Sequence, residues 1–252
     1  MCCCTPVGTL NVCTLCETGA ACLLMDELEA MDISVMGLQE VCWQGAGEMS
    51  IGNYRLLWSG PPEDKPRHAG VALALSKKAD PVNSRILVAR FKHRFGNLSF
   101  VVVYAPTNEA ADCDKHDFYQ TLEAALLLTK LNDMLISVGD FNAVSGTARD
   151  YPDVVGACGS GVPNDNTSRF ISFCAGANLR IAGLWYDRKN IHRFTWLSND
   201  GTTKKEIDHI LVNRRWKAIS NCRVYRKLEC HSDHRAVVGT FKLRFNPLRA
   251  SA

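Results

Sequence analysis

Short apolar runs alternate with amphipathic stretches along the whole chain, and this alternation constrains the fold more than any other feature. Most of the runs are rich in β-branched residues and bounded by Gly, Pro, Asn or Asp, as buried strands are. They cover residues 33–38, 70–75, 98–104, 134–138, 207–212 and 236–243. Because no linker, low-complexity tract or internal repeat interrupts them, the pattern predicts one layered α/β domain.

Three stretches between these runs carry apolar residues at helical spacing. Helices are therefore expected over residues 19–31, 115–130 and 166–177, with Asn166 as the N-cap of the third. The first residues of the chain leave little room for a core strand. We assign residues 1–245 to the domain and residues 246–252 to a C-terminal tail.

A hairpin is predicted after residue 193. A run containing Trp196 is followed by Ser-Asn-Asp-Gly at 198–201 and then by the run 207–212. Because Asp-Gly between two strand-like runs is a strong hairpin signal, we expect these two runs to be its arms.

Composition narrows the functional classes only partly. The chain of 252 residues has a formal net charge of +3, which is too small to indicate a nucleic-acid ligand by itself. Basic residues do concentrate in the segment 204–227, although such a run is often only a solvated face. No apolar run reaches the roughly 18 residues of a membrane span, so we expect no membrane partner.

The twelve cysteines include one CxxC pair, Cys13 and Cys16. No second CxxC or His pair follows at zinc-ribbon spacing. The N-terminus also lacks the charged segment and apolar core of an export signal. These features favour free cysteines in a reducing, intracellular environment.

Polar side chains recur beside the predicted strands, where loops present functional groups. Each one alone would be interpreted as a turn or cap residue, but the repeated placement at strand ends favours a shared site. The residues are Asn11, Glu40, Tyr104, Asn108, Asp140, Asn142, Asp208, Ser232, Asp233 and His234.

Five motifs occur in a fixed order: Leu-Gln-Glu, Tyr-Ala-Pro-Thr-Asn, Gly-Asp-Phe-Asn, Ile-Asp-His and Ser-Asp-His. Together with Asn11 they resemble the endonuclease/exonuclease/phosphatase superfamily over nearly the whole chain. Within it, the segments that begin at Gly161 and Phe194 resemble the endonuclease domains of RTE-type non-LTR retrotransposons and the craniofacial development protein 2-like host proteins. The resemblance implies an α/β (α+β), DNase I-like fold: a four-layer α/β/β/α sandwich of two mixed sheets flanked by helices.

The resemblance also implies a Mg²⁺-dependent DNA endonuclease that nicks DNA and leaves 3′-hydroxyl and 5′-phosphate ends. A phosphodiester is anionic, and a hard divalent ion with carboxylate ligands offsets the charge that opposes attack by water. Glu40 is the expected direct ligand, and Asn11 and Asp233 complete or support the metal site. Mn²⁺ is an alternative ion.

The expected catalytic residues are Tyr104, Asp140, Asn142, Asp208 and His234. Asp140 and Asn142 are close enough in sequence to converge on one water. Asp208 is expected to pair with His234, which acts either as a general base or, when protonated, as an electrostatic stabiliser. The sequence leaves both roles open. The expected substrate contacts are Asn108, Thr195, Lys204, Lys205 and Ser232.

One departure from the resemblance keeps a second function open. Retrotransposon domains usually have Trp-Asn-Val-Arg-Thr in the first motif, whereas this chain has Leu-Asn-Val-Cys-Thr at 10–14. The alternative is a catalytically inactive, truncated or domesticated domain that binds nucleic acid or a protein. Sphingomyelinases and deadenylases share the implied fold and rank lower. The intact motif residues favour the nuclease, with DNA as partner, a monomeric state and a nuclear location.

Overall fold

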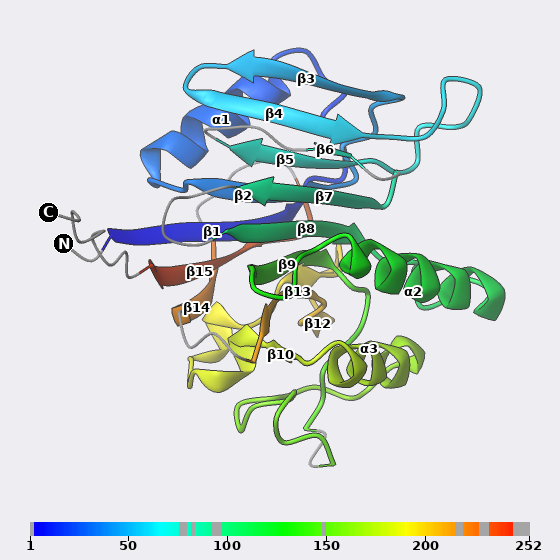
Figure 1. The fold of residues 1–252 in the computed structure, drawn as a ribbon, viewed down its shortest axis with the longest axis vertical. Helices are drawn as coiled ribbons and strands as arrows, with labels where there is room; N and C mark the ends of the chain where they lie inside the picture. Colours follow the sequence, from blue (N-terminus) through cyan, green and yellow to red (C-terminus); the bar gives the residue numbers. More distant parts are fainter. Residues whose placement is uncertain are drawn as a thin grey trace, which may run out of the picture.

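Two β-sheets pack face to face at the centre of the computed structural model, and helices cover their outer faces (Figure 1). The structure describes residues 3–75, 80–81, 84–91, 97–147, 150–214, 219–226 and 232–243. The predicted four-layer sandwich of two mixed sheets is confirmed. The proposed tail, residues 246–252, lies outside the described residues.

The first sheet has seven strands in the order β14-β15-β1-β2-β5-β4-β3. The strands are β1 (Cys3–Asn11), β2 (Val35–Gln39), β3 (Ala46–Ile51), β4 (Tyr54–Ser59), β5 (Val71–Leu75), β14 (Ile219–Tyr225) and β15 (Ala236–Leu243). β1 lies between β15 and β2, so the expectation that the start of the chain has little room for a core strand is wrong. At Gly8 this central strand has no room for a side chain, because a Cβ there would lie 2.8 Å from the Met36 methyl group.

The second sheet has six strands in the order β10-β13-β9-β8-β7-β6. The strands are β6 (Asp80–Pro81), β7 (Ile86–Phe91), β8 (Leu98–Tyr104), β9 (Met134–Asp140), β10 (Leu179–Ile181) and β13 (Asp208–Asn213). β8 runs parallel to β9, whereas β13 runs antiparallel to it. Every residue of β9 is buried, as expected for a strand covered on both faces.

In the described ranges, three helices complete the outer layers, and two short 3₁₀ turns, η1 (Ala182–Trp185) and η2 (Asn190–His192), follow them. Side chains of α1 (Ala20–Ala30) pack on the first sheet, and those of α2 (Asp112–Leu127) and α3 (Asp165–Gly176) pack on the second. A third apolar layer fills the space between the sheets. No helix within the described ranges is long and apolar enough to cross a membrane.

The N-cap of α3 is Asn164 rather than the predicted Asn166. Asn164 and Thr167 form a reciprocal capping box, in which each side chain bonds the backbone of the other residue. Asn166 lies inside the first turn, where its amide donates to the carbonyls of Pro106 and Asn142. Tertiary contacts therefore decide which asparagine caps the helix.

The predicted hairpin exists, but its second arm was predicted wrongly. β11 (Trp196–Leu197) pairs with β12 (Lys204–Lys205). The expected second arm, residues 207–212, instead forms most of β13, which pairs with β9 and β10 in the second sheet. The apolar residues of β13 are buried, so this strand lies inside the sandwich rather than in an exposed two-stranded hairpin.

Strand direction brings the polar residues to one end of the sandwich. β1 and β2 are parallel, as are β8 and β9, so Asn11, Glu40, Tyr104 and Asp140 lie at or just after carboxyl ends. Asp208 departs from the predicted pattern, because it begins its strand. It still reaches the same end, since antiparallel pairing places it opposite Asp140.

Gly139, directly before Asp140, allows β9 to lie close to Val103 of the neighbouring strand β8. A Cβ at this position would lie 1.9 Å from the Val103 carbonyl oxygen. Gly139→Ala should therefore lower the free energy of unfolding by about 3 kcal/mol. Gly176→Ala is the matched control, because a Cβ there meets nothing within 4 Å, and it should change stability by at most about 1 kcal/mol. Urea unfolding of both variants measures the difference, and equal effects would contradict this explanation.

Candidate active site

The side-chain amide of Asn11 joins the two sheets at the centre of the site. Its Nδ2 donates to Glu40 Oε1 at 2.7 Å and to Asp140 Oδ2 at 3.1 Å. Its Oδ1 accepts the backbone N–H of Cys13 at 3.0 Å, which fixes the orientation of the amide. Asn11 thus supports the two carboxylates, and a direct contact between its oxygen and a metal ion stays a prediction.

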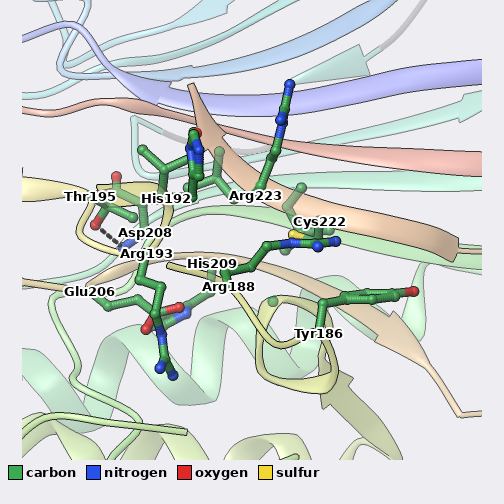
Figure 2. Close-up of a pocket in the computed structure, with 14 residues that line it drawn as sticks. Tyr186, Arg188, His192, Arg193, Thr195, Glu206, Asp208, His209, Cys222 and Arg223 are labelled. Atoms are coloured by element: carbon green, nitrogen blue, oxygen red, sulfur yellow. Dashed lines mark hydrogen bonds between the residues drawn. The ribbon is translucent and has the colours of Figure 1, made fainter. Parts of the chain in front are cut away.

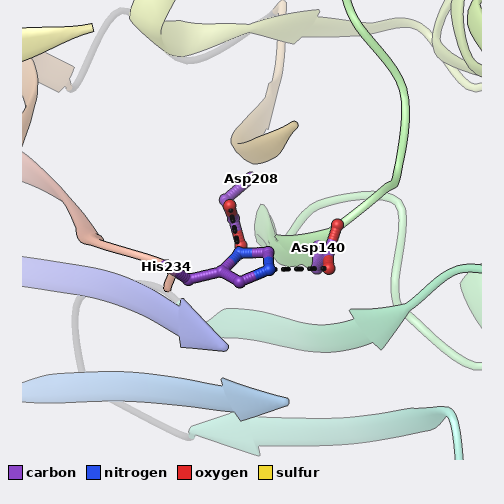
Figure 3. A group of neighbouring side chains, drawn as sticks. All are labelled: Asp140, Asp208 and His234. Atoms are coloured by element: carbon purple, nitrogen blue, oxygen red, sulfur yellow. Dashed lines mark hydrogen bonds and ion pairs between the residues drawn. The ribbon is translucent and has the colours of Figure 1, made fainter. Parts of the chain in front are cut away.

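The His234 ring lies between the carboxylates of Asp208 and Asp140 (Figure 3). Its Nδ1 is 2.9 Å from Asp208 Oδ2, and its Nε2 is 3.9 Å from Asp140 Oδ2 and 4.0 Å from Asp233 Oδ1. Both His234 and Asp208 are buried. The Asp208 carboxylate therefore fixes the imidazole so that Nε2 faces Asp140.

The surrounding charges hold a proton on His234. Burial opposes the charged form, but the hydrogen bond and charge of Asp208, with smaller contributions from Asp140 and Asp233, raise the His234 pKa to about 10. Burial and the Asp208 charge raise the Asp140 pKa to about 7, against the opposing effect of His234. In the metal-free protein the imidazole is thus a cation at neutral pH, which favours the electrostatic role over that of a general base.

Carboxylate oxygens at this end suit a hard divalent cation. One candidate group consists of Asp140, Asp208 and His234, whose ligand atoms all lie within 4.8 Å of one another. Within this group the Asp208–His234 hydrogen bond occupies Nδ1 and Oδ2. Glu40 and Asp140 both accept from the Asn11 amide nitrogen, so these two carboxylates form a second acidic set.

The remaining predicted catalytic residues also lie at this end. Tyr104 is buried and its ring lies beneath the Arg85 guanidinium, whose Cζ is 5.0 Å from the ring centre. Burial, followed by the charges of Glu40 and Asp140, raises the Tyr104 pKa, so its hydroxyl keeps its proton. Asn142 donates its backbone N–H to Asp140 Oδ1 at 2.8 Å and its side-chain amide to the Ala105 carbonyl at 3.0 Å.

Asp233 and Ser232 are held by neighbouring loops. Asp233 accepts the indole N–H of Trp196 at 2.7 Å and the thiol of Cys13 at 3.1 Å. Ser232 donates to the Asn11 carbonyl at 2.7 Å and accepts the backbone N–H of His234 at 3.0 Å. Ser232 thus fixes the loop that carries His234, in addition to its predicted place near substrate.

Thr195 does not lie on the surface as expected. Its exposed fraction is 1%, and its hydroxyl oxygen accepts the backbone N–H groups of Ile207 and Asp208. The side chain is buried because it holds the start of β13, so it positions Asp208 rather than facing DNA. Lys204 and Lys205 are exposed, as predicted, and the Lys205 ammonium lies 5.4 Å from the centre of the Trp196 ring.

Asn108 links the motif loop to α3. Its side-chain oxygen accepts the backbone N–H of Asp165 at 3.0 Å, and its carbonyl accepts Lys115 Nζ at 2.7 Å. Both contacts fix the loop that follows Tyr104.

Several residues that shape the site were not expected from the sequence. Trp196 and Cys13 both bind Asp233, and their places inside recognised motifs were the available signal. Arg85 gave no sequence signal, because its place over Tyr104 depends on the pairing of β7 with β8. Four non-glycine residues near the site have positive φ: Cys13, Glu40, Cys42 and Asn142. Such strained conformations concentrate at functional sites.

Comparison with known proteins identifies the family. The Endonuclease/Exonuclease/phosphatase family matches residues 8–234, most of the chain. The chain belongs to this family. It is also 29% identical over 246 residues to craniofacial development protein 2 of Bos taurus, covering 94% of this chain and 41% of that protein. The chain thus spans about two fifths of the length of the curated relatives it matches.

Solved structures show the same fold. The 3′ phosphatase NExo from Neisseria, bound to a product DNA hairpin, is similar with a TM-score of 0.70 and 20% identity, covering 95% of this chain and 100% of that one. The endonuclease domain of TRAS1, a telomere-specific non-LTR retrotransposon, has a TM-score of 0.66 and 15% identity, covering 95% of this chain and 99% of that one. The AP endonuclease LMAP from Leishmania major has a TM-score of 0.69 and 14% identity, covering 96% of this chain and 88% of that one. These likenesses show that the chain shares its fold with nucleases and with a 3′ phosphatase.

Titration of the histidines by NMR in EDTA should reveal the charge on His234. Its imidazole should titrate near pH 10, so it contributes stability that is complete below its ordinary pKa of 6.5 and is lost as pH rises through about 10. His209 serves as the internal control, because burial lowers its pKa. A His234 midpoint below pH 7 would show that the imidazole is neutral and available as a base.

Proposed function

We propose that this chain is a Mg²⁺-dependent DNA endonuclease that nicks a phosphodiester bond and leaves 3′-hydroxyl and 5′-phosphate ends. The observation that carries the proposal is the placement of charged His234 between Asp208 and Asp140, beside the Asn11-linked pair of Glu40 and Asp140. This arrangement combines a cation for the phosphoryl oxygens with carboxylates for a metal ion and for an attacking water.

Each residue then has a distinct task. Glu40 would hold the ion with help from Asp140, and Mg²⁺ bound there, or Mn²⁺ in its place, would neutralise charge on the phosphate. Asp140, whose pKa is raised by burial and by the charge of Asp208, would accept a proton from the attacking water. The Tyr104 hydroxyl, which keeps its proton, would donate to a phosphate oxygen, and His234 would stabilise the negative charge that develops during attack.

Two exposed lysines and two similar folds support DNA as the substrate. Lys204 and Lys205 stand exposed on the β11–β12 hairpin, close to the Trp196 contact with Asp233. Among the similar folds, NExo is bound to a product DNA hairpin and the TRAS1 domain belongs to a retrotransposon. We therefore propose a retrotransposon-derived domain that acts as a monomer on nuclear DNA, and size-exclusion chromatography and cell fractionation would test the last two points.

Nicking of supercoiled plasmid tests the catalytic assignment. The unmodified protein should nick with Mg²⁺ and not with EDTA, and Glu40→Ala and His234→Ala should each lower the rate by at least about 100-fold. The matched controls, Glu123→Ala and His116→Ala, change exposed residues of α2 and should nick at the unmodified rate. Absence of nicking by folded, unmodified protein would instead support the alternative, a catalytically inactive domain that binds nucleic acid or protein.

The salt dependence of DNA binding tests the two lysines. If each contacts one phosphate, the Lys204→Ala, Lys205→Ala double variant should reduce the slope of log K against log salt by about 2. Lys130→Ala, at an exposed position just after α2, should leave the slope unchanged. Fluorescence anisotropy with a labelled duplex provides the measurement, and an unchanged slope in the double variant would remove both lysines from the DNA interface.

A further inference from the structure

The short strand β11 is paired along both of its edges. One edge pairs with β12, which carries the two exposed lysines. On the other edge Trp196 pairs antiparallel with His234. Leu197, the second residue of β11, donates its backbone N–H to the Asp233 carbonyl at 3.2 Å. β11 therefore joins the lysine-bearing hairpin directly to the segment that carries Asp233 and His234.

Two adjacent residues of this segment hold two of the acids around His234. Thr195, directly before β11, accepts the backbone N–H of Asp208 at 3.1 Å through its hydroxyl (Figure 2). The next residue, Trp196, donates its indole N–H to Asp233 Oδ2 at 2.7 Å. Asp208 Oδ2 lies 2.9 Å from Nδ1 of the imidazole, and Asp233 Oδ1 lies 4.0 Å from Nε2. Neighbouring residues thus support an acid at each nitrogen of the His234 ring.

Of these two acids, Asp233 depends more on its side-chain donors. Its side chain is 34% exposed, whereas that of Asp208 is 0% exposed. The last side-chain torsion of an aspartate has a broad energy well, so its donors set the orientation of the carboxylate. Asp233 Oδ1 accepts the Cys13 thiol at 3.1 Å, and Oδ2 accepts the Trp196 indole. A thiol is a weak donor, so the indole N–H is the stronger of these two contacts.

The Trp196 side chain has a second contact that does not use its N–H group. The Lys205 ammonium lies 5.4 Å from the centre of the indole ring, within the range of a cation–π interaction. A phenylalanine at position 196 would still offer Lys205 an aromatic face, but it has no donor for Asp233. Substitution can therefore separate the two contacts.

We propose that Trp196 is a positioning residue for the nuclease reaction. Its indole N–H holds the Asp233 carboxylate in one orientation, with Oδ2 bonded and Oδ1 turned toward His234 Nε2. Asp233 is thereby kept where it can support the proposed metal site. The catalytic consequence rests on the proposed function, whereas the contact that orients Asp233 does not.

A double-mutant cycle in plasmid nicking tests the catalytic consequence. Trp196→Phe should lower kcat by about tenfold with KM unchanged, because a supporting donor is lost while both lysines remain. If Trp196 acts through Asp233, Trp196→Phe should cause no further loss in an Asp233→Ala background. Trp185→Phe changes an exposed tryptophan of η1 and is the matched control. Full kcat in Trp196→Phe, or losses that multiply in the double variant, would overturn the positioning role.

An NMR measurement without activity separates this inference from the proposed function. The assigned indole N–H resonance of Trp196 should shift in Asp233→Ala and not in Asp117→Ala, which changes an exposed acid of α2. An unshifted resonance in Asp233→Ala would overturn the proposal, even if Trp196→Phe fails to fold. If the unmodified protein does not nick DNA, the proposed function fails, and the resonance still decides whether Trp196 holds Asp233.

Discussion

The amide of Asn11 lies between two carboxylates that belong to different sheets, and the rest of the site depends on this contact. Glu40 follows a strand of the first sheet, whereas Asp140 ends a strand of the second. Two neighbouring carboxylates repel each other, and buried Asp140 also loses hydration, so a neutral donor between them stabilises their approach. The Cys13 backbone N–H holds the amide in the donating orientation. The contact that brings the site together therefore also joins the two sheets.

The positive charge of His234 balances this acidic cluster. Asp208 supplies the strongest interaction, and Asp140 and Asp233 add to it. Because all four groups lie in or near the interior, their charges interact more strongly than they would in water. Thr195 and Ser232 then act through backbone N–H groups to hold the strand and loop that carry Asp208 and His234. The side chains of the site are therefore held in place by hydrogen bonds to the strand and the loop that carry them.

Much of the fold could be predicted from the sequence, because buried strands and amphipathic helices have distinct apolar patterns. The run 98–104 coincides with β8, and 236–243 coincides with β15. The errors share one cause. The N-cap at Asn164, the second hairpin arm at β12 and the central place of β1 were all decided by partners distant in sequence. Local propensity carries no information about such partners.

The sequence by itself determined the family, the order of the motifs and the residues that meet at the site, because strand ends and short motifs are local properties. Only the tertiary structure decided their individual roles. It buried Thr195 and turned the Asn11 oxygen away from the carboxylates. Burial and charge proximity exist only once the two sheets have packed, and these two quantities set the protonation of His234 and Asp140.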